Sequence, residues 1–492
     1  MTGSQSLGSI ALRWLVIGHR WLGIITCILF VVWFASGLVM MYVGYPSLTT
    51  AERMSRSRAI EWNRVRIEPE RVLQGLSLAE FPRSFRLVMM NGEPVYQVVA
   101  NGWPTRAVSA VDGRIIEHIT PSQALSIARL SAPDAQPAVA TTIELDQWSV
   151  AGTYNPHRPL HLVPLNDAPG TEVYISSVTG EIVLDSTRRE RAWNWVGAVL
   201  HWFYFRDLRV NGPMWSQVVM WTSGIGIFGA ITGLWLGIDR LRLRRGNPNS
   251  SVTPFRGWMA WHHIAGVIGG VFVLTWIFSG WLSMGPPVPW EKPFDPRRIT
   301  AGTAAFAGNT EADFPMDAAT FHRLTDRNAR EAAFVWILGR PTIVLMNERS
   351  ETQLIDAAAG NTTQLREADL VAAAPKLLAD AKLVESETLD HEDAYWYSRR
   401  GERSVPVLRF KFDDADHTWV HVDPRTGKIV GWMRDSDRIH RWLFNALHSF
   451  DFRWLLNARP AWDLLLWVLS LAGLTISVSG VVIGWKHLKR RT

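Results

Sequence analysis

Four histidines recur at equal intervals in the two halves of this 492-residue chain. The interval from the first histidine to a Ser-Gly pair is the same in both halves, and so is the interval from a Thr-Gly pair to the second histidine. A further glycine follows the second histidine at one common distance. Such ungapped agreement indicates an internal duplication. The matching positions are His19 and His262, Ser36-Gly37 and Ser279-Gly280, Thr179-Gly180 and Thr426-Gly427, His201 and His448, and Gly233 and Gly480.

The repeated histidines lie in or beside long apolar stretches, where an ionisable side chain needs a partner or a function. Two neutral imidazoles that face each other in a helical bundle suit the axial positions of a haem iron. Equivalent helices of a duplicated bundle would supply one ligand on each side of a porphyrin. We therefore expect His19 with His262, and His201 with His448, to bind two haem b groups. The alternative is that each histidine is a hydrogen-bonded core or interface residue.

Two further histidines are secondary candidates for the same chemistry. His263 adjoins His262, but successive residues point about 100° apart on a helix, and its counterpart in the first half is Arg20. His440 corresponds to Trp193. We expect a structural or lipid-headgroup role for both, while His263 stays open as an alternative to His262 at the inner site.

Other common chemistries have no matching pattern in the sequence. The only cysteine, Cys27, lies inside an apolar stretch, so neither a disulfide framework nor a cysteine zinc site is expected. The HExxH, GxSxG, P-loop and dinucleotide-binding glycine patterns are absent from the sequence. The net charge of +6 comes largely from Arg and Lys beside apolar stretches, which indicates membrane topology. We expect no nucleic-acid partner.

Four stretches are long and apolar enough to span a lipid bilayer: residues 14–43, 218–238, 258–284 and 461–485. Many of the 26 tryptophans lie near their ends, as in the interface belts that contact membrane lipid. Basic residues follow the second and fourth stretches, so the positive-inside rule predicts an inner (plasma) membrane protein with both termini in the cytoplasm. These residues are Arg240, Arg242, Arg244, Arg245 and Arg256, and Lys486, Lys489, Arg490 and Arg491.

The predicted fold is a membrane α+β protein whose four transmembrane helices form a pseudo-twofold, duplicated bundle. Each extracytoplasmic segment is expected to hold paired units of a helix followed by antiparallel strands, and a helix is expected after Thr120-Pro121. The expected order is a first span at 14–43, an outer domain at 44–191, an amphipathic helix with the second span at 192–238, a cytoplasmic loop at 239–257, a third span at 258–284, an outer domain at 285–437, an amphipathic helix with the fourth span at 438–485, and a basic tail at 486–492.

Several sequence motifs resemble the PepSY-associated transmembrane family over nearly the whole chain. The resemblance implies PepSY-like outer domains and, because some members resemble ferrisiderophore reductases with haem on bundle histidines, it supports His19, His201, His262 and His448 as ligands. The motifs are His19-Arg20-Trp21-Leu22-Gly23, Glu190-Arg191-Ala192-Trp193-Asn194-Trp195 leading to Leu200-His201-Trp202, Asn155-Pro156-His157-Arg158-Pro159-Leu160-His161, Tyr397-Ser398-Arg399-Arg400-Gly401-Glu402 and Val422-Asp423-Pro424-Arg425-Thr426-Gly427.

The leading functional hypothesis is a membrane haem protein that moves electrons outward to reduce a ferric chelate, a ferrisiderophore, in iron uptake. The haem would carry the redox chemistry, and the protein would position and tune it. The cytoplasmic loop at 239–257 is too short for a flavin or nicotinamide domain, so the electron donor would be a membrane quinol or a separate reductase.

Two other functions fit parts of the sequence. A non-redox membrane protein with PepSY domains would bind or regulate a periplasmic partner, and its four spans would serve only as an anchor. A transporter would carry the intact chelate across the membrane, although four spans leave little room for an alternating pathway and no broken helix is evident.

Overall fold

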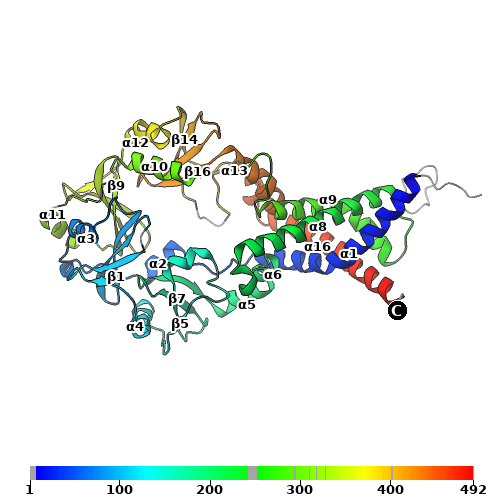
Figure 1. Cartoon of the computed structure of the whole chain (residues 1–492), viewed down its shortest axis with the longest axis horizontal. Helices are drawn as coiled ribbons and strands as arrows, with labels where there is room; N and C mark the ends of the chain where they lie inside the picture. Colours follow the sequence, from blue (N-terminus) through cyan, green and yellow to red (C-terminus); the bar gives the residue numbers. More distant parts are fainter. Residues whose placement is uncertain are drawn as a thin grey trace, which may run out of the picture.

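The computed structural model describes residues 7–102, 104–241, 252–291, 295–309, 311–316, 318–326, 328–399 and 403–490. Most of the basic loop at 239–257, which was predicted to be cytoplasmic, lies outside the described residues, and with it Arg242, Arg244 and Arg245. So do the end of one family motif, Arg400-Gly401-Glu402, and Arg491. A helical bundle forms one end of the molecule, and antiparallel sheets form the other (Figure 1).

Four long helices form the bundle: α1 (Leu7–Met40), α8 (Gly212–Asp239), α9 (Trp258–Leu282) and α16 (Ala461–Lys489). Each is long and apolar enough to cross a membrane. Even the shortest, with 25 residues, rises roughly 37 Å, which exceeds a hydrocarbon core of about 30 Å. Helices α1 and α9 each pack against both α8 and α16. The chain is therefore a multi-pass membrane α+β protein.

Aromatic rings pack closely against glycines near the middle of the bundle. Phe30 and Phe34 of α1 are buried with Val273 and Ile277 of α9. A Cβ atom built on Gly473 of α16 would lie only 2.5 Å from Cζ of Phe34. Small residues at such crossings let membrane helices approach closely, where lipid provides no hydrophobic drive for association.

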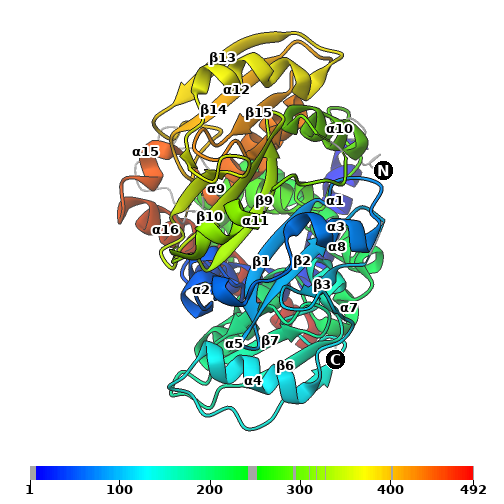
Figure 2. The same cartoon turned by 90° about the vertical axis from the view of Figure 1, so that its left-hand side faces the viewer.

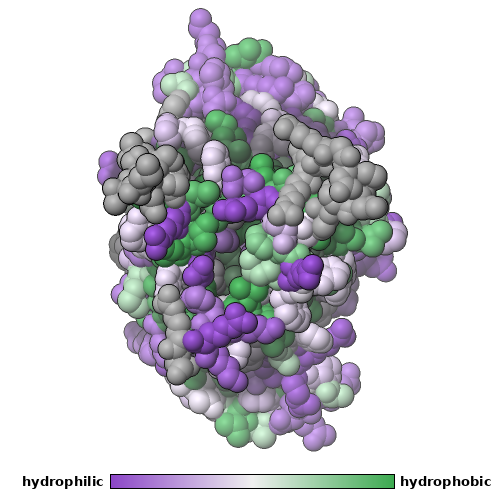
Figure 3. Space-filling view, turned by 90° about the vertical axis from the view of Figure 1, so that its right-hand side faces the viewer, coloured by the Kyte–Doolittle hydropathy of each residue, from purple (hydrophilic) through white to green (hydrophobic). Residues whose placement is uncertain are grey.

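The bundle end farther from the sheets carries basic side chains at the ends of two helices. The last turn of α16 holds Lys486, His487 and Lys489, and Arg240 follows α8. Figure 3 looks onto this end and shows hydrophilic side chains between hydrophobic ones. We call this the inner end of the bundle, and the end that faces the sheets the outer end.

An eight-stranded antiparallel sheet joins strands from both segments outside the bundle, the one between α1 and α8 and the one between α9 and α16 (Figures 1 and 2). The joint is the pairing of β1 with β9, where Leu87 lies opposite Ala332. This link between the two outer segments was not predicted from the sequence. In spatial order the strands are β12 (Thr362–Thr363), β11 (Thr352–Asp356), β10 (Arg340–Met346), β9 (Glu331–Ile337), β1 (Ser84–Met90), β2 (Glu93–Val99), β3 (Arg106–Ser109) and β4 (Ile115–Ile116).

Two four-stranded antiparallel sheets flank the eight-stranded sheet, one from each half of the chain. Helix α4 (Pro121–Ser131) packs on the first of them and begins at the predicted N-cap, Thr120, whose hydroxyl accepts from the backbone of Gln123. Helix α12 (Glu367–Ala373) packs on the second sheet. The strands are β5 (Thr141–Ile143), β6 (Leu160–Pro164), β7 (Glu172–Ser176) and β8 (Ile182–Ser186), and β13 (Leu383–Leu389), β14 (Val407–Phe412), β15 (Trp419–Val422) and β16 (Ile429–Met433).

Short helices complete the outer assembly, by which we mean the three sheets and the helices around them. Among the described residues these are α2 (Thr50–Arg56), η1 (Trp62–Arg64), α3 (Pro69–Leu76), η2 (Gly152–His157), α10 (Pro296–Ala307), α11 (Ala318–His322), η3 (Arg323–Asp326) and η4 (Ala374–Leu378).

The segments that lead from each sheet back into the bundle are broken helices. The sequence predicted one amphipathic helix in each, but Gly197 interrupts the first, and a π-helical turn, η5 (Arg441–Ala446), interrupts the second. Just beyond these helices Phe203 and Phe450 take left-handed φ angles of 52° and 51°, which reverse the chain toward the spans. The pieces are α5 (Arg188–Val196), α6 (Ala198–His201) and α7 (Arg206–Arg209), and α13 (Asp435–His440), η5, α14 (Leu447–Ser449) and α15 (Arg453–Leu456).

Candidate functional site

The inner histidine pair is formed by His19 of α1 and His262 of α9. Their ring centres lie 6.3 Å apart, and their planes are inclined by 46°. Nδ1 of His19 lies 3.2 Å from the hydroxyl of Thr232 on α8. Nδ1 of His262 lies 3.1 Å from the hydroxyl of Ser479 on α16. All four transmembrane helices therefore contribute to this pair.

The outer histidine pair is formed by His201 of α6 and His448 of α14. Their ring centres lie 6.1 Å apart, and their planes are inclined by 78°. Nδ1 of His201 lies 3.1 Å from the hydroxyl of Ser36 on α1, and Nδ1 of His448 lies 3.0 Å from that of Ser279 on α9. The short helices after the sheets thus bring both rings to the outer ends of two spans.

The hydroxyl partners fix which ring nitrogen carries the proton. The hydroxyls of Ser36 and Ser279 donate to the carbonyls of Trp33 and Trp276, three residues earlier on their own helices. Thr232 and Ser479 donate in the same way within α8 and α16. A hydroxyl whose proton is already engaged accepts from the imidazole, so Nδ1–H is the donor and Nε2 keeps its lone pair.

The spacing of both pairs fits an iron atom held between two Nε2 atoms. Metal–nitrogen bonds of about 2.0 Å, with about 1.1 Å from each nitrogen to its ring centre, place two axial imidazoles with their centres about 6.2 Å apart. The observed separations are 6.3 Å and 6.1 Å. Nδ1–H bonds to oxygen acceptors are also the usual support of a metal-bound histidine. The residues present therefore fit haem ligation.

A glycine borders each of the four imidazoles. A Cβ atom built on Gly233 would lie 2.8 Å from Cε1 of His19, and one on Gly37 would lie 3.4 Å from Cε1 of His201. The corresponding distances are 3.5 Å from Gly480 to His262 and 3.6 Å from Gly280 to His448. An added carbon at Gly233 would therefore displace the His19 ring, whereas at the other three glycines it would be in ordinary contact with the imidazole.

The two outer imidazoles are neutral near neutral pH. Burial, with a smaller contribution from the neighbouring His448, lowers the pKa of His201 to about 3. Burial also lowers the pKa of His448 to about 4, against the partial offset of the Trp276 carbonyl. A neutral imidazole is the form that binds a metal ion.

The structure turns the secondary candidates away from both pairs. Nε2 of His263 lies 2.9 Å from the backbone oxygen of Gly237, and its ring packs edge-on against Phe255. It is His262 that faces His19. The His440 ring is tilted against Phe444 with ring centres 5.3 Å apart, and Phe444 in turn stacks on His448. Both secondary candidates therefore have local contacts that explain their positions.

The sequence analysis found Ser36 and Ser279 as repeated positions but missed that they hold the imidazoles, and it missed Thr232 and Ser479 altogether. A hydroxyl residue followed by glycine is the signal that could have found them, because it stands beside every one of the four histidines. The hydroxyl orients the ring, and the glycine makes room for its edge. The four pairs are Ser36-Gly37, Thr232-Gly233, Ser279-Gly280 and Ser479-Gly480.

A polar cluster on the second half adjoins the outer pair. The carboxylate of Asp451, three residues beyond His448, accepts from Tyr397 at 3.1 Å and from Arg399 at 2.6 Å. Its side chain is 2% exposed, whereas that of Arg399 is 37% exposed. The described part of the family motif at 397–399 therefore joins the outer assembly to the helix that carries His448.

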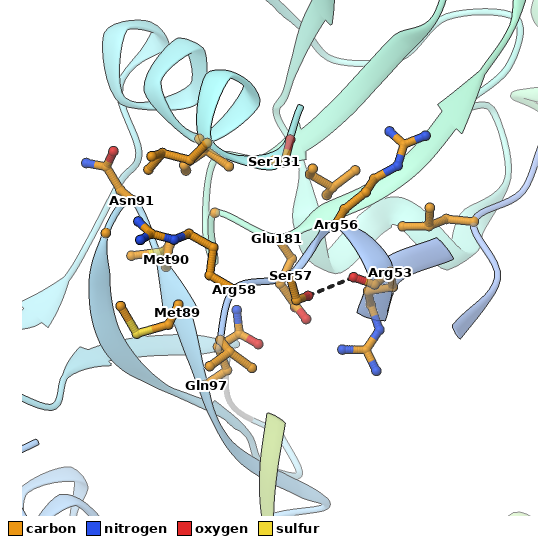
Figure 4. A pocket seen from close by; sticks show the side chains of 17 residues that line it. Arg53, Arg56, Ser57, Arg58, Met89, Met90, Asn91, Gln97, Ser131 and Glu181 are labelled. Carbon is orange, nitrogen blue, oxygen red and sulfur yellow. Dashed lines mark hydrogen bonds between the residues drawn. The ribbon is translucent and has the colours of Figure 1, made fainter. Parts of the chain in front are cut away.

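A small pocket opens within the outer assembly, between α2, the β1–β2 turn, α4 and the β7–β8 turn (Figure 4). Arg58, Asn91, Ser131 and Glu181 line it together with Met90. Its volume is about 80 Å³, whereas pockets for drug-sized ligands hold roughly 300–1,000 Å³. The pocket is too small for a whole iron chelate.

The fold and the site define a four-span membrane protein with antiparallel sheets at one end of its bundle and two facing histidine pairs. The family model described as the PepSY-associated TM region matches residues 16–333. The chain belongs to this family. No curated protein matches the chain.

Proposed function

We propose that this protein is an inner-membrane b-type haem protein that passes electrons across the membrane to reduce a ferric chelate in iron uptake. One observation carries the proposal: two pairs of facing imidazoles, each with the separation of axial haem ligands, lie at the two ends of one transmembrane bundle. The sheets and the outer pair would then lie on the periplasmic side, with both termini in the cytoplasm.

The matching contacts of the two halves support a duplicated, pseudo-twofold bundle. His19 contacts Thr232 of α8, as His262 contacts Ser479 of α16. At the outer end, each histidine bonds the serine of its own half. Each half thus holds its own two imidazoles, and each pair forms only where the halves meet.

The distance between the pairs suits transfer across a membrane. Ser36, which holds His201, lies on the same continuous helix as His19. The helix rises roughly 26 Å from His19 to Ser36, and the hydrocarbon core of a bilayer is about 30 Å thick. One pair would therefore lie near each membrane surface.

The hydroxyl residues, the bundle helices and the outer assembly would have different roles in electron transfer. The hydroxyl groups hold each imidazole in the tautomer that leaves Nε2 free, and the packed helices keep water from the rings. Haem, when bound, would supply reversible one-electron chemistry at its iron. The outer assembly would present the chelate.

The electron balance requires a donor that the chain does not contain. A quinol would release two electrons and two protons, and two ferric chelates would each accept one electron to become ferrous. A separate reductase is the other possible donor. Ferrous iron binds hard oxygen ligands less strongly than ferric iron, so reduction would release the metal.

The proposal is tested by mixing anaerobically reduced, purified protein with a ferric siderophore and following haem absorbance in a stopped-flow instrument. We expect rapid reoxidation together with formation of ferrous iron, trapped by a ferrous-specific chelator. The His201→Ala variant should lose the fast phase, whereas His440→Ala should keep it. Reduced haem that the chelate leaves unchanged would defeat the proposal.

A second candidate function follows from the outer assembly. The eight-stranded sheet ties both halves together outside the bundle, as a platform for a periplasmic protein partner would require. This candidate predicts that the His201→Ala variant retains full function in cells, which separates it from the redox proposal.

A further inference from the structure

The two histidine pairs differ in the angle between their rings. The outer rings of His201 and His448 are inclined by 78°, which is close to perpendicular. The inner rings of His19 and His262 are inclined by 46°. The ring separations are nearly equal, 6.3 Å for the inner pair and 6.1 Å for the outer pair, so orientation is what distinguishes them.

Contacts on two sides fix each ring orientation. The hydroxyl partner anchors Nδ1, and the bordering glycine limits rotation about that anchor. The limit is tightest at His19, where a Cβ atom on Gly233 would come within 2.8 Å of Cε1 and 3.5 Å of Nε2. It is looser at His201, where the shortest distance from Gly37 is 3.4 Å. The hydroxyl contacts therefore orient the rings, and the His19 ring is the one most sensitive to a larger residue beside it.

We propose that the two imidazole pairs hold their haems in electronically different states, with Gly233 and Gly37 as positioning residues and the outer haem as the stronger electron acceptor. This inference rests on the proposed haem function. It adds to that function an electronic difference between the two sites.

The physical basis is the overlap of imidazole π orbitals with the iron d orbitals. Rings that share one plane raise a single iron dπ orbital, which stabilises the ferric ion. Perpendicular rings act on two different dπ orbitals and leave them nearly equal in energy, so this ferric stabilisation is lost. The outer haem would then have the higher reduction potential, and electron transfer from the inner haem to the outer one would be thermodynamically favourable.

Electron paramagnetic resonance of the oxidised, purified full-length protein tests the inference. Near-perpendicular axial imidazoles give a single, strongly anisotropic low-spin signal at high g, whereas less perpendicular rings give an ordinary rhombic low-spin signal. We expect one signal of each kind, in equal amounts. A redox titration should show two steps, with the high-g signal disappearing first as the potential is lowered.

Two alanine variants and a matched control assign the signals. In Gly233→Ala, the new methyl group must displace the His19 ring, so the rhombic signal should shift or be lost while the high-g signal stays. In Gly37→Ala, the high-g signal should shift while the rhombic signal stays. Gly224→Ala lies on the same helix as Gly233 with no atom within 4 Å of the new carbon, and both signals should stay unchanged.

Two outcomes would overturn the inference while the proposed function survives: two identical signals in the unmodified protein, or a Gly233→Ala protein with both signals unchanged. A haem assay on the same samples keeps the two proposals apart. Protein without haem refutes the proposed function itself, whereas two haems per chain with one kind of signal refute only the asymmetry.

Discussion

Nδ1 of His201 lies 3.1 Å from the hydroxyl oxygen of Ser36, a residue of its own half of the chain. The ring that His201 faces, His448, belongs to the other half and has the equivalent serine, Ser279, at 3.0 Å. Each outer imidazole is thus oriented by a serine of its own half, whereas the pair needs one imidazole from each half. A half-chain would present single imidazoles, which cannot hold a haem iron from both sides.

Removing the serine hydroxyl tests its role as a support. In Ser36→Ala, the Trp33 carbonyl at 3.1 Å remains for Nδ1 of His201, but one of two acceptors is gone. We expect outer-haem affinity to fall about tenfold, the lower end of such effects at metal sites, as measured by haem transfer to apomyoglobin. Ser283→Ala is the control, because that hydroxyl bonds only the Gly280 carbonyl among the described residues. Equal transfer rates in both variants would contradict the assigned role.

Each histidine pair should bind its haem independently of the other pair. Replacing His201 with Ala removes one outer ligand and leaves His19 and His262 intact. The haem content should fall from two per chain to one, measured as the pyridine haemochrome against protein mass. His440→Ala should retain two, because the His440 ring packs against Phe444 and is not one of the two facing imidazoles. Loss of both haems from a folded His201→Ala protein would show that the sites are coupled.

Acidification should weaken the joint between the two outer segments. Burial would raise the pKa of Glu331, but Arg86 and Arg53 beside it outweigh burial, and the pKa lies below its ordinary value of 4.5. A lowered folded-state pKa gives a stabilisation that is fully present above about pH 4.5 and is lost as pH falls through the folded-state pKa.

The comparison with Glu331→Gln isolates this ionisation. The melting temperature of the unmodified protein should exceed that of Glu331→Gln at pH 7, and the gap should narrow below about pH 4.5. Both proteins are measured by intrinsic fluorescence between pH 3 and pH 8. A difference in melting temperature that stays constant from pH 3 to pH 8 would show that the charge of the Glu331 carboxylate contributes nothing to stability.

The bundle centre should not tolerate a larger residue at Gly473. The added methyl group of Gly473→Ala would lie 2.5 Å from Cζ of Phe34, and such overpacking costs about 1–3 kcal/mol. Gly224→Ala adds the same group in open space, where replacing a helical glycine is favourable by about 0.5–1 kcal/mol. The melting temperature in detergent should therefore fall for Gly473→Ala and rise for Gly224→Ala, relative to the parent protein. A Gly473→Ala protein as stable as the parent would contradict this packing.

Local pattern was sufficient to predict the spans and the histidine candidates. An apolar stretch of sufficient length has to lie in a membrane or deep in a core, and the structure forms a long helix over each of the four. The equal intervals around His19 and His262 reflect one helix geometry used twice. The structure places these two rings face to face, and it does the same for His201 and His448. Whether they bind haem stays a prediction.

Long-range pairing was not predictable from the sequence. The alternating pattern of β1 indicates which face is buried, but it does not name the neighbouring strand. Leu87 pairs with Ala332 of the segment between α9 and α16, and no local pattern near either residue indicates this pairing. The sequence did not predict the helix breaks before the outer histidines. Whether a helix bends at a residue such as Gly197, or widens into a π-helical turn, depends on tertiary contacts. The roles of Thr232 and Ser479 needed coordinates for the same reason.

The haem content of the purified protein tests the central claim most directly. A pyridine haemochrome assay with quantitative amino-acid analysis gives the number of b-type haems per chain, and the absorption spectrum reports their ligation. We predict two haems per chain, low-spin in both oxidation states, with one lost on His19→Ala and one on His448→Ala. Protein that folds, inserts into the membrane and contains no haem when expressed with ample haem supply would contradict the account.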